Sequence, residues 1–145
     1  MSQMKLYKRK DRKNLYVRHK GKLRDLTDTA PVMMWTTDER GLVTFVNPGW
    51  LRFTGTTLEE ELGLMKSSGV HPDDSHTVMA SWNEHLARRE PWECEYRLRG
   101  RGGKYRWILD RGVPRYAGDR FVGYAGAAID IHERRTVEGP PARGT

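Results

Sequence analysis

Residues 92–110 read WECEYRLRGRGGKYRWILD, and this stretch decides the fold. Aromatic and aliphatic side chains alternate with charged ones on both sides of a glycine-rich centre, which is the two-residue period of a half-buried β-strand. Residues 100–103 contain three glycines and predict a tight turn. The stretch therefore predicts two antiparallel strands with one face toward a core.

The strand predicted over residues 120–131 is rich in small side chains. It holds Gly123, Ala125, Gly126, Ala127 and Ala128. Because so many small residues leave volume above a sheet unless something large fills it, we expect a cavity over this strand. We take the odd-numbered positions as facing inward, so that Ala125 and Ala127 form the floor of the cavity and Asp130 faces outward.

Two further strands are predicted upstream, over residues 32–37 and 42–46, joined by a short turn. Asn47 then precedes Pro48, which predicts the start of a short helix. Thr57 begins another helix with the residue pattern of a capping box.

The longest helix is predicted over residues 72–89, with Pro at its first position and acidic residues in its first turn. Val78, Trp82 and His85 or Leu86 recur at helical spacing. This helix therefore has one face that points inward, and we expect it to cover the sheet.

Length and composition indicate one domain with appendages. The chain has 145 residues and one cysteine, so an internal disulfide is excluded. No apolar run approaches the roughly 20 residues that span a bilayer, and no signal-peptide pattern opens the chain. We expect a soluble, cytoplasmic protein without membrane contacts.

The basic charge is concentrated at the N-terminus. Ten of the 26 basic residues and one of the 19 acidic residues lie in residues 1–24, which leaves 16 bases against 18 acids elsewhere. We interpret residues 1–24 as a basic arm or hairpin. It is similar to the basic hairpins of arm-type DNA-binding modules in phage integrases, and the alternative is a solvated extension.

Several short motifs occur in a fixed order between residues 26 and 135. They are Asp38 and Gly41 in the first turn, Asn47 after the second strand, His71-Pro72-Asp73-Asp74 before the long helix, Glu95-Tyr96-Arg97-Leu98, Tyr105-Arg106-Trp107 with Asp110, Gly123-Tyr124, and Asp130-Ile131 with Glu133-Arg134. In this order and spacing the chain resembles the PAS domain family with its C-terminal PAC segment.

The resemblance implies an α+β fold, in which a five-stranded antiparallel sheet carries short helices and one longer helix on one face. It places the PAS domain at residues 25–135, followed by a tail over 136–145 that we expect to be disordered. It also implies a sensory role: a small ligand binds between sheet and helix, the domain forms a homodimer, and a C-terminal helix relays the signal to a partner protein. The usual Asp-Ile-Thr-Glu-Arg ending has His132 in place of Thr, and we expect Asp130 and Arg134 to pair and steer this helix.

Seven residues are candidates for the cavity, either stacking on a ligand or forming plain core. They are Met34, Trp82, His85, Tyr96, Trp107, Ala125 and Ala127. Haem-binding members of the family use an imidazole on or just after the long helix, so His85 is the candidate axial ligand; a packed, hydrogen-bonded histidine is the alternative.

Other chemistry finds little support in the sequence. The resemblance implies that a flavin photosensor of this family would need a cysteine on the helix after the second strand to form its adduct, and residues 47–55 contain none. Cys94 lies at an apolar strand position and is interpreted as a small core residue. The His and Asp residues of positions 71–76 lack zinc-ligand spacing and are interpreted as a helix cap. No nucleophile–base motif or phosphate loop occurs, so we expect no enzymatic activity.

Three functions remain open at this stage. The first is a ligand-sensing, dimeric PAS module. The second is a ligand-free protein-interaction and dimerisation domain whose interior is filled by its own side chains. The third is a nucleic-acid-associated regulator that uses the basic arm, whose binding would weaken steeply as salt rises.

Overall fold

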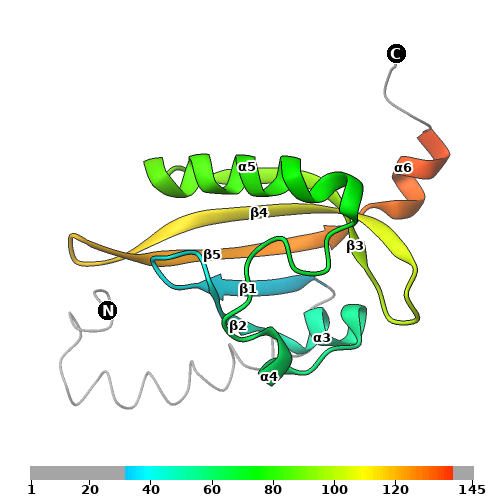
Figure 1. Ribbon diagram of the computed structural model, residues 1–145, viewed down its shortest axis with the longest axis horizontal. Coiled ribbons are helices and arrows are strands. Elements are labelled where there is room, and N and C mark those ends of the chain that lie inside the picture. The colour runs from blue at the N-terminus through cyan, green and yellow to red at the C-terminus, as the bar shows by residue number, and fades with distance from the viewer. Residues whose placement is uncertain (1–31, 139–145) are drawn as a thin grey trace.

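The computed structural model describes residues 32–138. The basic arm predicted over residues 1–24, the start of the domain and the last seven residues lie outside the described part of the chain. Within it, five strands form one antiparallel sheet in the order β2-β1-β5-β4-β3 (Figure 1). The strands are β1 (Met33–Thr37), β2 (Val43–Val46), β3 (Trp92–Arg99), β4 (Tyr105–Ala117) and β5 (Arg120–Asp130).

Within residues 32–138, four helices accompany the sheet, the first three predicted from local signals and the last implied by the resemblance. They are α3 (Pro48–Thr54), α4 (Leu58–Glu61), α5 (Pro72–Arg88) and α6 (His132–Glu138). The long helix α5 lies across one face of the sheet, while α3 and α4 lie near β1 and β2 (Figure 1). The predicted α+β fold with a five-stranded antiparallel sheet is therefore confirmed.

Local sequence signals explain where the helices begin and end. The Asn47 side chain accepts a hydrogen bond from the Trp50 backbone N–H and caps α3, which ends at Gly55 with φ of 78°. Thr57 forms a capping box at the start of α4. At the start of α5, His71 Nδ1 accepts a hydrogen bond of 3.0 Å from the Asp73 backbone N–H. The histidine at this position therefore caps a helix.

The strand register shows which side chains face α5. Trp35 of β1 pairs with Gly126 of β5, and Asp110 of β4 pairs with Ala128 of β5. Tyr124 and Ala128 are fully buried. The even-numbered positions of β5 thus face the core, and the expectation that odd-numbered positions do so is wrong.

Helix α6 continues the chain beyond the end of β5. It runs from His132 to Glu138 and so includes three residues of the segment predicted as a disordered tail. Figure 1 shows it beyond the end of the sheet, separate from α5. Within residues 32–138, no helix has the length and apolar character needed to cross a membrane.

Candidate functional site

A buried ion pair lies at the centre of the domain. The side chains of Lys66 and Asp110 are 3% and 0% exposed, and Lys66 Nζ lies 2.7 Å from Asp110 Oδ2. The same oxygen accepts a 2.7 Å hydrogen bond from the Tyr96 hydroxyl, and Oδ1 accepts one of 2.7 Å from Trp35 Nε1–H. Both carboxylate oxygens therefore have donors, which buried charge requires.

Three indole rings surround the ammonium group of Lys66. Its Nζ lies 4.0 Å from the ring centroid of Trp35, 5.2 Å from that of Trp92 and 5.5 Å from that of Trp50. All three distances fall within the range of cation–π attraction, which is strongest for Trp and for desolvated cations. We call these three rings together with Asp110 the ammonium cage.

The small residues of the sheet make room for Trp35. A Cβ at Gly112 would lie 2.6 Å from Trp35 Cη2, and one at Gly126 would overlap the Trp35 ring and the Arg111 carbonyl oxygen. Trp82 and Trp92 pack edge-on against Trp35, with centroids 5.8 and 6.3 Å away. The volume that the sequence indicates over β5 is thus occupied by an indole from the neighbouring strand.

The structure divides the predicted cavity residues between the two faces of the sheet. Trp82 and Tyr96 are each 1% exposed and belong to the core beneath α5. Strand pairing places four others on the opposite face: Met34, Trp107, Ala125 and Ala127. Assigning these four to the cavity is wrong, because it places them on the wrong face of their strands. Neighbouring residues of a strand point to opposite faces, so an error of one position moves a side chain to the other side of the sheet.

His85 lies near the C-terminal end of α5 and is partly buried. Its Nδ1 is 2.7 Å from the carbonyl oxygen of Ser81 on the same helix. The His85 carbonyl oxygen accepts a 3.0 Å bond from the Tyr124 hydroxyl, which ties α5 to β5. The role of His85 as a haem ligand stays a prediction.

A pocket of about 490 Å³ lies on the side of α3 and α4. Its lining comes from these helices, the loop after α4 and the β3–β4 turn, and includes Trp50, Glu60, Glu61 and Arg99. Trp50 therefore belongs to both the pocket and the ammonium cage. Its Nε1–H is buried and has no hydrogen-bond acceptor in the described part of the chain.

Burial shifts two weak acids near the cage toward their neutral forms. The pKa of Tyr96 is raised well above its ordinary value, first by burial and then by the charge of Asp110. Burial, aided by the charge of Asp110, raises the pKa of Cys94 to about 11. At neutral pH the Tyr96 hydroxyl is therefore a hydrogen-bond donor and the Cys94 thiol is unreactive.

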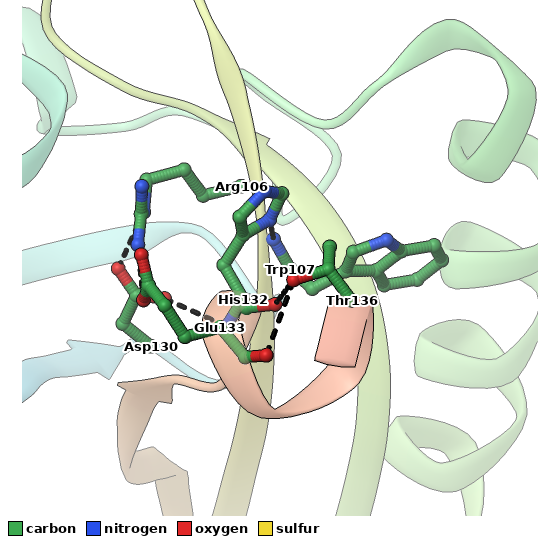
Figure 2. A network of polar contacts seen from close by, with 6 residues as sticks. All are labelled: Arg106, Trp107, Asp130, His132, Glu133 and Thr136. Atoms are coloured by element: carbon green, nitrogen blue, oxygen red, sulfur yellow. Dashed lines mark hydrogen bonds and ion pairs between the residues drawn. The ribbon is translucent and has the colours of Figure 1, made fainter. Parts of the chain in front are cut away.

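The second feature of interest is the junction between the sheet and α6. Arg106 of β4 binds Asp130 through Nε and Glu133 through Nη2, both at 2.7 Å, as Figure 2 shows. His132 Nδ1 accepts a 3.1 Å hydrogen bond from the Trp107 backbone N–H (Figure 2). The Trp107 carbonyl oxygen accepts one of 3.0 Å from the Ile131 N–H.

Arg135 completes this junction on the outer face. Its guanidinium lies 3.7 Å from the Trp107 ring centroid, and it also binds the Glu95 carboxylate of β3. The predicted partner of Asp130 is wrong: Arg106 of β4, and not Arg134 of the helix, binds its carboxylate. The basic residue that contacts the sheet from α6 is Arg135.

Sequence reasoning did not find Lys66, Trp35 or Trp50 as parts of one site. They are far apart in the chain, and a single Lys in a turn carries no periodic signal. The expectation that Trp107 faces inward puts Asp110 on the outer face of β4, and this is wrong because Asp110 is fully buried. Among residues 32–138, no three His, Cys, Asp or Glu side chains gather as a metal site.

Comparison with known proteins agrees with the fold. The family model described as PAS fold matches residues 43–128. The uncharacterized protein y4lL of Sinorhizobium fredii is 42% identical over 118 residues, which cover 81% of this chain and 14% of that protein. The aerotaxis receptor of Escherichia coli is 28% identical over 106 residues, covering 73% of this chain and 20% of the receptor. A PAS domain from Colwellia psychrerythraea has 22% identity and a TM-score of 0.68, covering 82% of this chain and 99% of that one.

The chain belongs to the PAS fold family. It spans less than a quarter of the length of these two curated relatives. Domains of this family thus occur as parts of larger proteins, including a sensory receptor.

Proposed function

We propose that this domain is the sensory module of a signalling protein, in which a small ligand bound on the helix side of the sheet changes the position of α6. The observation that carries the proposal is the arrangement of β4. Asp110 is part of the buried cage, while the Trp107 backbone, on the same strand, accepts a hydrogen bond from Ile131 just before α6 and donates one to His132, the first residue of α6. One strand therefore contacts both the interior and the departing helix.

The pocket beside α3 and α4 supports ligand binding. Its volume of about 490 Å³ lies in the range of small-molecule sites. Trp50, whose indole N–H has no acceptor among residues 32–138, forms part of its wall. Native mass spectrometry of freshly purified protein tests this role: we expect a bound small molecule. Protein at its bare mass, from several expression conditions, would instead favour the ligand-free interaction domain.

The relay can be tested by hydrogen exchange of the α6 amides. Arg106→Ala removes two ion pairs at the junction, so we expect faster exchange over residues 132–138. Arg120→Ala, at the exposed start of β5, serves as the control. Asp110→Asn should also change α6 exchange if the interior and the junction are coupled. Unchanged α6 exchange in Asp110→Asn would contradict the relay.

Dimerisation is proposed through the face of the sheet opposite α5. Val113 and Ile129 on this face are 54% and 43% exposed, and the Ala125 and Ala127 positions lie between them. These apolar residues surround the exposed Arg111–Glu93 ion pair, and such a mixed surface suits contact with a second copy. Sedimentation should show a dimer that Val113→Lys weakens, while Asp119→Lys in the β4–β5 turn leaves it intact. A monomer at all concentrations would exclude this part of the proposal.

A further inference from the structure

The ammonium cage has the chemistry of a binding site, and its present occupant is a side chain of the protein. Lys66 Nζ contacts one buried carboxylate oxygen at 2.7 Å and lies over three indole rings. Rings of this kind around an acid are how proteins recognise organic ammonium ions. Nothing in the contact requires that the ammonium belong to the chain.

We propose that the cage formed by Trp35, Trp50, Trp92 and Asp110 binds small primary ammonium ligands, and that Lys66 occupies it as an internal substitute until such a ligand displaces it. The inference rests on the proposed ligand-sensing function and names the chemical class of the ligand. A primary ammonium is favoured because the site offers one short N–H···O contact to Asp110 together with aromatic faces.

The loop that carries Lys66 is attached at its two ends. The Gly63 N–H bonds the Val43 carbonyl oxygen at 2.8 Å, and the Arg99 N–H bonds the Gly69 carbonyl oxygen at 2.9 Å. The Val43 N–H also bonds the Leu64 carbonyl oxygen at 3.0 Å, and between Leu64 and Gly69 the backbone bonds are local, such as the 3.0 Å bond from the Ser68 N–H to the Met65 carbonyl oxygen. Lys66 can therefore leave the cage without breaking a strand pairing.

The neighbouring pocket shares one wall with the cage. Trp50 lines both, so a molecule in the pocket lies against one wall of the cage. Two carboxylates, those of Glu60 and Glu61, line this pocket against one guanidinium, that of Arg99. The excess of negative charge favours entry of a cation. The Met65 side chain next to Lys66 is 52% exposed, so it does not anchor the loop in the core.

The test measures binding of ethylammonium chloride to the full chain and to variants, by tryptophan fluorescence and by the thermal midpoint. Lys66→Ala empties the cage, so ethylammonium should raise its midpoint while equal potassium chloride or 1-propanol should not. The wild type should bind about 10- to 1000-fold more weakly, because the vacated state is a minor one. Lys104→Ala, an exposed lysine in the β3–β4 turn, should behave as the wild type.

Two further variants separate specific binding from a general salt effect. Lys66→Met fills the cage with a neutral side chain and should abolish ethylammonium binding. Lys66→Ala/Asp110→Asn leaves the cage empty but removes the carboxylate that pairs with the ammonium, so it should not bind ethylammonium either. Equal responses of folded Lys66→Ala to ethylammonium and potassium chloride would overturn the proposal. If Lys66→Ala does not fold, recovery of its circular dichroism by ethylammonium supports the proposal, and failure to recover overturns it.

The same design separates this inference from the proposed function. A wild type that shows no ethylammonium response, even at 1000-fold the dissociation constant of Lys66→Ala, would show that Lys66 is never displaced and would overturn the inference. A different compound found by native mass spectrometry, without any amine effect, would overturn the ammonium assignment and leave the sensory function standing.

Discussion

The stability of the domain should depend strongly on Lys66. Lys66→Met keeps a side chain of similar length in the cage but removes the ammonium, which leaves Asp110 buried with an unpaired charge. Removing one partner of a buried pair typically costs about 3–5 kcal/mol. Asp110 retains two donors, from Trp35 Nε1–H and the Tyr96 hydroxyl, so we expect the lower end, about 3 kcal/mol.

Urea denaturation followed by circular dichroism measures this loss. The double variant Lys66→Met/Asp110→Asn should recover most of it, because neutral groups in place of both ions remove the unpaired charge. Arg40→Met is the matched control, since the Arg40 side chain of the Asp38 pair is 73% exposed. This control should change the free energy of unfolding by less than about 1 kcal/mol. A loss as small as the control's in Lys66→Met would refute the buried geometry described above.

Three further changes have defined outcomes. Gly112→Ala places a methyl group against Trp35 Cη2 and should lower the free energy of unfolding, measured in urea, by about 1–3 kcal/mol. The loss should be smaller in a Trp35→Leu background, and an equal loss in both backgrounds would exclude the steric cause. Arg97 hydrogen bonds lower the pKa of Asp74, so the stability from this pair is complete above pH of about 4 and is lost as the pH falls through the lower folded pKa. Asp74→Asn should therefore be less stable than the wild type at neutral pH and lose less stability on acidification, and parallel pH curves would contradict this. Because burial raises the pKa of Cys94 to about 11, iodoacetamide should modify the folded protein slowly at pH 8 and faster as the pH approaches 11, and modification as fast as that of free cysteine at pH 8 would contradict this environment.

The parts of the fold predictable from sequence are those set by local chemistry. The capping residue Asn47, the capping box at Thr57 and the glycines of residues 100–103 each determine an element boundary within a few positions. The two-residue alternation of β3 was equally clear. Such signals depend on neighbours in the chain, so one sequence suffices to read them.

The inward face of β5 could not be read in this way. Its run of glycine and alanine has no alternation of polar and apolar residues, and the parity of a strand is undetermined without one. The deciding contact is Trp35 against Gly126, on strands separated by most of the chain. The small residues of β5 do leave volume above the sheet, but the expected cavity there is wrong, because the Trp35 indole fills that volume. The sequence does not state whether a ligand or an indole fills that space.

An interior filled by its own side chains changes what ligand recognition would require. A ligand that enters an empty cavity gains its contacts directly, whereas a ligand that displaces Lys66 must replace the contact with Asp110 and the three indoles. Its apparent affinity equals the intrinsic affinity multiplied by the fraction of molecules in which Lys66 has left the cage. Compounds that lack a cation would leave Asp110 buried and unpaired, a cost of several kcal/mol that few neutral contacts offset. Under the ammonium proposal, specificity therefore comes from the charge the ligand replaces rather than from the shape of a preformed void, and the charged cage excludes neutral molecules that would fit by size.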